Sequence, residues 1–159
     1  MDIKEILRNS FAASHLTPAS VRVRLLRLLG LDLGAKTAIA SGVTFKGGSV
    51  TTGEGCFINH GVYVDRRELR LGNRVYIAPR VMFATRNHEI GQRHKRAGDN
   101  LNQPISVGSG TWIGANATIL GGVKIASGCI IAAGAVVTKD TKADGLYAGV
   151  PAVRIKDLI

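Results

Sequence analysis

The sequence predicts an all-β protein, a parallel β-helix, from three observations. Apolar residues recur every six positions over most of the chain, and a small or β-branched residue recurs four positions after each of them. Glycine is frequent, at 20 of 159 residues, whereas aromatic residues make up only 5 %. A period of six fits neither an α-helix nor an alternating strand, so each repeat must be a short strand followed by a turn.

Fifteen six-residue units can be read between Leu33 and Lys142. Their first position is apolar except at Thr52, and their fifth position is small or β-branched except at Glu68 and Asn87. Three units form one triangular coil, with the first position inside and the fifth at a tight corner. Such coils stack about 4.8 Å apart, so the units give roughly five coils whose two ends need caps.

The chain therefore divides into three parts. Residues 1–32 are expected to form an N-terminal helical cap, because "VRVRLLRLLGL" is amphipathic and Thr17 and Pro18 precede it as helix-start residues. A basic amphipathic helix could instead contact a membrane surface. Residues 33–142 form the β-helix with a loop at 89–106, and residues 143–159 are a C-terminal tail that serves as the other cap.

Composition excludes several function classes. The formal net charge of +10 is spread along the chain without a basic stripe that alternates with aromatic residues, so a phosphorylated cofactor or substrate is a better partner than nucleic acid. Cys56 and Cys129 both occupy the fifth position, where they act as small buried hydrophobes rather than as metal ligands or catalytic thiols. Arginines interrupt any signal-peptide core, so a cytoplasmic protein without a membrane span is expected.

The repeat is interrupted once, in "FATRNHEIGQRHKRAGDNLNQPISVG". Asn87 breaks the fifth-position rule, His88 follows it, and the chain returns to the pattern at Val107. Excursions of this length are usually functional. A histidine there can take a proton from a hydroxyl or amine near neutral pH. A lone histidine can also be an ordinary surface residue, so its context decides.

That context resembles the hexapeptide-repeat acyltransferases. The repeats themselves, "NHEIG" before the loop and "PISVGSGTWIGANATILGGVKIASGCIIAAGAVVTKD" after it are similar to the maltose, galactoside and nodulation-sugar O-acetyltransferase branch. The resemblance implies a left-handed β-helix, a homotrimer with active sites between subunits, and acetyl-CoA as cosubstrate without a metal. It also implies that His88 is the catalytic general base.

The same resemblance implies further site residues. Those that match substrate-binding positions are Asn59, Asp65 and Trp112. Those that match positions around acetyl-CoA are Ala115, Ala133, Thr138 and Lys139, and the Ala115 N–H is the expected donor to the thioester oxygen. The His88 ring could be oriented by Glu89 or by a backbone carbonyl. The basic residues near the loop are candidates for contacting an anionic cofactor or acceptor: Arg86, Arg93, Lys95 and Arg96.

Two departures from the family pattern bear on specificity. In the closing stretch "YAGVPAVRIKDL", Val153 stands where a basic residue is common, so Arg154 or Lys156 must contact the cofactor phosphates instead. Only about thirty residues precede the repeats, fewer than in the maltose and galactoside enzymes. The expected acceptor is a sugar or glycoconjugate hydroxyl, and the alternative is a hydroxyl or amine of an antibiotic or another small molecule.

Two other functions remain open on the same fold. A γ-type carbonic anhydrase would need three histidines that converge on a zinc ion, and the chain offers His15, His60, His88 and His94. A non-catalytic trimeric scaffold would need no catalytic residue at all. Replacement of His88 separates the scaffold from the transferase.

Overall fold

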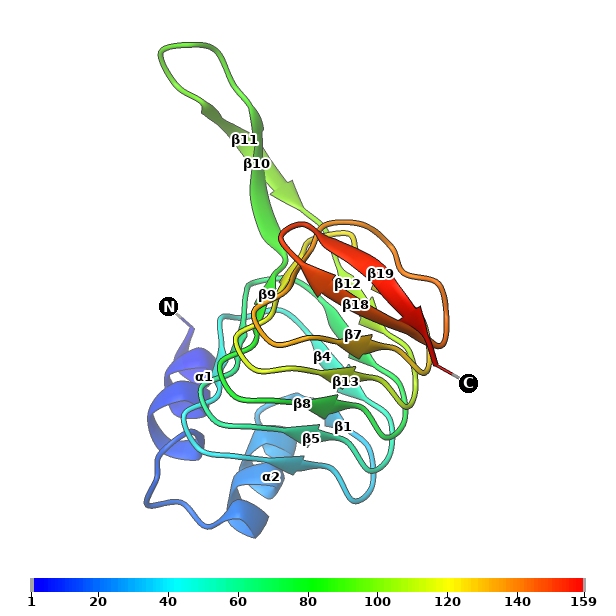
Figure 1. Ribbon diagram of the computed structural model, residues 1–159. Coiled ribbons are helices and arrows are strands. Elements are labelled where there is room, and N and C mark those ends of the chain that lie inside the picture. The colour runs from blue at the N-terminus through cyan, green and yellow to red at the C-terminus, as the bar shows by residue number, and fades with distance from the viewer. Residues whose placement is uncertain (1, 159) are drawn as a thin grey trace.

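The computed structural model describes residues 2–158. Three parallel sheets form the sides of a coiled wall, and the chain passes through each sheet in turn before it climbs to the next coil (Figure 1). The first fifteen strands of the wall make five complete coils, and one further strand adds part of a sixth to a single side. The fold class predicted from the six-residue period is confirmed.

The strands of the wall are short. The first side contains, in spatial order, β1 (Asp32–Leu33), β4 (Val50–Thr52), β7 (Leu69–Leu71), β12 (Ile105–Val107) and β15 (Lys124–Ile125). The second contains β2 (Ala38–Ile39), β5 (Phe57–Ile58), β8 (Tyr76–Ile77), β13 (Trp112–Ile113), β16 (Ile130–Ile131), β18 (Gly145–Gly149) and β19 (Ala152–Asp157). The third contains β3 (Thr44–Phe45), β6 (Tyr63–Val64), β9 (Met82–Ala84), β14 (Thr118–Leu120) and β17 (Val136–Val137).

The core lies inside the triangular section and is built from the first position of each repeat. Every one of these side chains is buried, and Phe45 and Phe83 are the largest that are fully enclosed. The polar exception, Thr52, is also buried, and its hydroxyl lies 3.1 Å from the Thr37 hydroxyl and accepts a hydrogen bond from the Gly34 N–H. A hydroxyl in this position is tolerated because it has partners.

The fifth-position rule fails at one corner. Where the third side turns into the first, coils one and two contain an extra residue, so Val50 and Leu69 are buried in place of Ser49 and Glu68. Counting in sixes placed Ser49 at a fifth-position corner, whereas the structure leaves Ser49 exposed and buries Val50. A nineteen-residue spacing relates Phe45, Val64 and Phe83, which are consecutive partners in the third sheet.

The fourth position of the repeat makes the turn. Eight of these fifteen residues are glycines with positive φ, and four others also adopt the left-handed region, among them Lys36 (φ 56°) and Arg80 (φ 58°). Only glycine reaches this region without steric cost. The sequence reading took the fifth position as the corner and overlooked the fourth, although the frequent glycines there were the signal.

The N-terminal cap is helical, as predicted, and consists of α1 (Ile3–Ile6), a π-helical turn η1 (Leu7–Ala12) and α2 (Ala19–Leu28). Thr17 does not cap α2: its hydroxyl donates to the Phe11 carbonyl instead. Arg8 and Arg22 of this segment are buried, and Arg8, Arg22 and Arg27 donate to backbone carbonyls. None of the helices in residues 2–158 has the length and apolar content needed to cross a membrane.

The C-terminal tail is a β-hairpin. Strand β18 continues the second sheet in parallel with β16, and β19 then pairs with β18 in the antiparallel sense. Figure 1 shows this hairpin lying along the end of the coils, opposite the end that the N-terminal helices cover. Helices therefore cover one end of the wall and a β-hairpin covers the other.

Candidate functional site

The interruption of the repeat is a β-hairpin that projects away from the wall (Figure 1). Its strands are β10 (Arg86–Ile90) and β11 (Ala97–Asn102), which pair with each other in the antiparallel sense. The chain leaves the wall after Thr85, which is fully buried, and re-enters it at Ile105. The excursion therefore begins before the loop bounds of 89–106, and Asn87 belongs to the hairpin rather than to a corner of the coil.

His88 lies on β10 with its ring exposed to solvent. Its Nδ1 is 3.0 Å from the carbonyl oxygen of Gly98 on β11. A carbonyl oxygen only accepts hydrogen bonds, so Nδ1 carries the proton in the neutral ring and Nε2 keeps its lone pair. Glu89 and a backbone carbonyl were the two groups expected to orient the His88 ring, and the hydrogen bond is made by the carbonyl. This is the tautomer that a general base needs.

The Gly98 carbonyl is held in place by a close approach of the two strands. A Cβ on Gly98 would lie 2.9 Å from the Glu89 carbonyl oxygen and 3.2 Å from the Gly91 nitrogen. The pairing also shifts its register between His88 and Ile90, next to this contact. Glycine is therefore required at position 98 for the strand spacing that carries the His88 hydrogen bond.

Replacing Gly98 with alanine is expected to lower acetyl transfer about tenfold, the effect of losing one hydrogen bond of about 1.4 kcal/mol to the ring. The added methyl forces β11 to shift and moves the carbonyl away from Nδ1. The free energy of unfolding should not change, because the hairpin lies outside the core. Steady-state kinetics and urea denaturation measure the two quantities. The neighbouring Asp99→Ala is the control, and equal activity of both variants contradicts the role of the carbonyl.

Asn59 and Asp65 lie at opposite ends of one side of the wall. Asn59 follows β5 at the corner between the second and third sheets, and its Oδ1 accepts a hydrogen bond of 2.8 Å from the His60 N–H. Asp65 follows β6 at the corner between the third and first sheets, on the side from which the hairpin departs. Both side chains are half-buried. Within one chain the two residues do not converge.

The residues expected around acetyl-CoA are divided between the same two corners. Ala115 and Ala133 lie one coil apart at the corner where Asn59 stands, and the Ala115 carbonyl accepts a hydrogen bond from the Gly134 N–H. Trp112 projects from the adjacent second sheet beside Tyr76, and both side chains are more than half exposed. Among the backbone hydrogen bonds of residues 2–158, none has the Ala115 N–H as its donor. This N–H is therefore free to meet a ligand.

The other two cofactor candidates occupy the opposite corner. Thr138 and Lys139 follow β17, above Asp65 in the stack of coils, and the Lys139 side chain is exposed. The chain therefore presents the candidate residues in two separate sets, one at each end of its third sheet.

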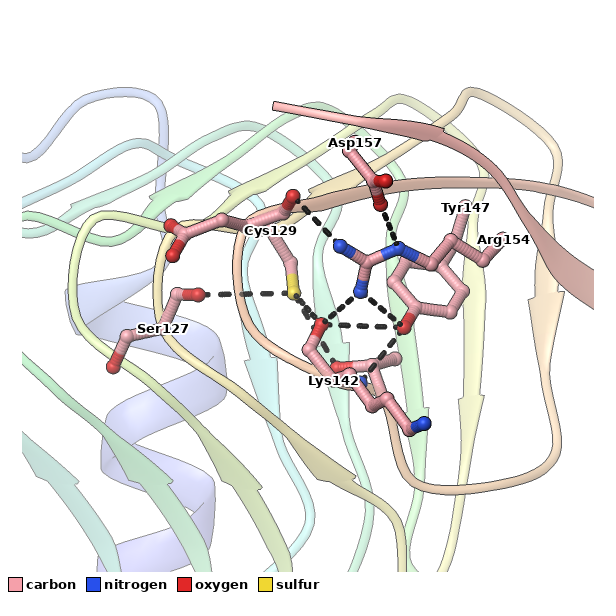
Figure 2. A network of polar contacts seen from close by, with 8 residues as sticks. Ser127, Cys129, Lys142, Tyr147, Arg154 and Asp157 are labelled. Carbon is pink, nitrogen blue, oxygen red and sulfur yellow. Dashed lines mark hydrogen bonds and ion pairs between the residues drawn. The ribbon is translucent and has the colours of Figure 1, made fainter. Parts of the chain in front are cut away.

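The Arg154 side chain is held in a network of hydrogen bonds at the C-terminal hairpin (Figure 2). Its guanidinium donates to Asp157 Oδ1 at 2.6 Å, to the Asp144 carbonyl at 3.0 Å and to the Lys142 carbonyl at 3.2 Å. It also lies over the Tyr147 ring, and hydrogen bonds to the Tyr147 hydroxyl and to Asp157 raise the pKa of Arg154. Lys156 is exposed. Of the two basic residues expected at the cofactor phosphates, Lys156 is the one with no structural task in this network.

The two cysteines are structural. Cys56 Sγ lies 3.0 Å from the Gly72 carbonyl, and burial raises the pKa of its thiol, which disfavours the reactive thiolate. Cys129 Sγ lies 3.3 Å from the Lys142 carbonyl in the network that Figure 2 shows. Both thiols thus have backbone partners inside the wall, in agreement with their fifth-position placement.

A pocket that the sequence reading missed lies at the base of the hairpin. It has a volume of about 360 Å³ and is lined by four cationic side chains, here called the arginine pocket: Lys46, Arg66, Arg67 and Arg86. Arg86 had been singled out with three other basic residues, Arg93, Lys95 and Arg96, but those three do not line the pocket. The nineteen-residue spacing could have predicted this pocket, because three of its lining residues, Gly48, Arg67 and Arg86, are nineteen residues apart.

Comparison with known proteins shows what the chain resembles. Residues 104–139 match the family model described as "Bacterial transferase hexapeptide (six repeats)". The galactoside O-acetyltransferase of Escherichia coli K12 is 29 % identical over 154 residues, which cover 96 % of this chain and 76 % of that enzyme. The predicted resemblance to the hexapeptide-repeat acyltransferases is confirmed at this level.

Two further relatives extend the comparison. A hexapeptide-repeat acetyltransferase of Vibrio cholerae, solved with acetyl coenzyme A, has a TM-score of 0.80 and 29 % identity, and the match covers 98 % of this chain and 84 % of that one. A Schizosaccharomyces pombe protein named as an acetyltransferase is 34 % identical over 113 residues. The chain spans 55 % of the length of that relative. Acetyltransferase is the enzyme class common to these names.

Two of the four histidines lie close together. His15 of the cap and His60 of the second coil stack with ring centroids 6.4 Å apart, and their Nδ1 atoms lie 2.8 Å and 3.1 Å from the buried Ser41 hydroxyl. His88 lies on the projecting hairpin instead. Across residues 2–158, no group of three or more His, Cys, Asp or Glu side chains is arranged to hold a metal ion. The pair joins the cap to the wall.

Proposed function

We propose that the protein transfers the acetyl group of acetyl-CoA to a hydroxyl of a sugar or glycoconjugate, with His88 as the general base. The observation that carries this proposal is the His88 ring, whose Nδ1 is bound to the Gly98 carbonyl at 3.0 Å and whose Nε2 is left to accept a proton. Similarity to known enzymes supports the chemistry, since relatives are named as galactoside O-acetyltransferases and one solved relative contains acetyl coenzyme A.

The proposed reaction is a direct transfer. His88 Nε2 takes the proton of the acceptor hydroxyl as the hydroxyl oxygen attacks the thioester carbonyl carbon. The negative charge that develops on the carbonyl oxygen is met by the free N–H of Ala115. The carbon–sulfur bond then breaks, and the imidazolium returns its proton to the CoA thiolate. No covalent acyl-enzyme forms, in agreement with the structural role of both thiols.

The proposal includes association into a homotrimer. Two features support it: the candidate residues occupy two separate corners of one protomer, and the outer face of the second sheet carries exposed aromatic rings. Tyr76 and Trp112 are 56 % and 52 % exposed, although they are register partners in the centre of a sheet. Apolar surface of this kind marks an interaction site. In a trimer, Asn59 and Ala115 of one protomer would face Asp65, Thr138 and His88 of the next.

The experiment that tests this function measures release of the CoA thiol from acetyl-CoA over a panel of sugars, amino acids and antibiotics. Thiol release that depends on a sugar, with one acetyl ester formed per thiol, is the expected result. Thiol release that depends only on an antibiotic or an amine would show that the acceptor belongs to that class and is not a sugar. Absence of release with every acceptor, from protein shown to be folded, would support the scaffold function.

A further inference from the structure

The arginine pocket concentrates positive charge that the protein itself does not neutralise. Lys46 is paired with Glu5, whose carboxylate lies 3.9 Å from Nζ. Within residues 2–158, Arg66, Arg67 and Arg86 have no carboxylate within 4.0 Å. Three like charges around one pocket repel each other, and the repulsion is relieved when an anion binds between them.

The wall forms the pocket by stacking turns. Gly47 and Gly48 of the first coil line it together with Arg66 and Arg67 of the second. A Cβ at Gly48 would lie 2.7 Å from the Arg67 carbonyl oxygen, so glycine allows the two turns to approach. Gly47 has open space where its side chain would be. The two glycines therefore leave the pocket unfilled beneath the guanidinium groups.

The hairpin connects the pocket to the catalytic histidine. Arg86 and His88 are two residues apart on β10, so their side chains leave the strand on the same face, about 7 Å apart along it. Their register partners on β11 are Asn102 and Asn100, and both asparagines also line the pocket. The His88 face of the hairpin is therefore the face that the pocket occupies.

Asp65, the candidate acceptor ligand, belongs to the same neighbourhood. It directly precedes Arg66, and the charges of Asp65, Arg66 and Arg86 all act on the phenol of Tyr63, whose pKa is raised mainly by burial. By contrast, the residues expected around acetyl-CoA lie on the fourth and fifth coils and on the C-terminal hairpin. The pocket is lined by residues of the first three coils. Because successive coils are about 4.8 Å apart, it lies apart from the residues expected around acetyl-CoA.

We propose that the arginine pocket binds the phosphate of a phosphorylated glycosyl acceptor while His88 deprotonates a hydroxyl of the same molecule. This inference rests on the proposed function and narrows its acceptor class. Phosphate fits better than carboxylate, because several guanidinium forks can share its oxygens and its charge at neutral pH is greater. A monosaccharide ring spans the separation between Arg86 and His88.

The test compares one hexose with its phosphate ester and with its uronate, as acceptors and as ligands. With acetyl-CoA present, we expect kcat/KM for the phosphate ester to exceed that of the neutral sugar at least tenfold, and Arg66→Gln with Arg86→Gln to remove the advantage. Arg70→Gln is the control for the loss of an arginine outside the pocket, since Arg70 does not line the pocket and is paired with Glu68 at 2.7 Å. The advantage should also decline as salt is added.

Calorimetric titration of the hexose phosphate into the full-length protein without acetyl-CoA separates the two proposals. The wild type and Arg70→Gln should bind it, and the double variant should bind at least tenfold more weakly. If binding follows this pattern but no acceptor yields thiol, the proposed function fails while the pocket stands. If the neutral sugar or the uronate is bound and acetylated as well as the phosphate, or if the double variant keeps the preference for phosphate, the phosphate assignment is wrong.

Discussion

Replacing His88 with alanine is expected to lower kcat/KM for acetyl transfer by 10² to 10⁴, the usual contribution of a general base. The variant keeps the pocket and the wall but has no group that can take the hydroxyl proton. Its free energy of unfolding should match that of the wild type, because β10 is exposed along its whole length. Thiol release and urea denaturation, measured on the same preparations, provide both numbers.

The control is His94→Ala, which removes an exposed imidazole from the tip of the same hairpin. This variant should retain wild-type activity, since His94 is outside both strands. The general-base role is contradicted if the two alanine variants have the same activity, or if His88→Ala loses less than about tenfold. A scaffold protein would show no measurable difference in either assay.

Replacing Arg22 with methionine is expected to reduce the free energy of unfolding by about 3 kcal/mol, since several buried carbonyls lose their donors at once. The side chain is only 4 % exposed and donates to four carbonyls, those of Ala12, Ser14, Thr17 and Ile39. Burial lowers the pKa of this guanidinium, but its hydrogen bonds compensate for the loss of water. The bond to Ile39 fastens the cap to the first coil.

Arg24→Met is the matched control for this prediction. Arg24 lies on the same helix, two residues away, and its side chain is exposed. Its replacement should change the free energy of unfolding by no more than about 0.5 kcal/mol. Denaturation curves at one fixed protein concentration avoid the effect of association on stability. Equal destabilisation by the two changes would show that α2 tolerates the loss of its buried donor.

The repeat could be predicted because it is dictated by local sterics and burial. Inner residues such as Ile58 and Ile119 must be apolar in every coil, so they leave a period in the sequence. The count in sixes places the extra residue of these two coils after Val50 and Leu69 instead of before them, since Ser49 is as small as a true corner residue. Only strand pairing across coils, with its nineteen-residue spacing, places Val50 correctly.

The candidate site was less predictable, because its parts meet through stacking rather than through neighbouring positions. His88 was visible as a break in the repeat, whereas the Gly98 carbonyl that orients it depends on the pairing within the hairpin. Arg86 was one of the basic residues singled out near the loop, but its approach to Arg66 depends on the stacking of the turns. Arg154 was expected to replace the basic residue that Val153 displaces, but its contacts with Asp157 and Tyr147 give it a role in the C-terminal hairpin.

The hairpin of β10 and β11 carries the proposed general base, whereas the apolar core inside the wall stabilises the fold. The exposed residues of the hairpin contribute little to the wall, so changes there seldom carry the destabilisation that removes most mutations from a population. The turns at Gly47 and Arg66 are also on the surface and can vary within limits that the coil spacing sets. Acceptor preference in proteins of this design can therefore diverge quickly, while the inner apolar ladder stays almost fixed.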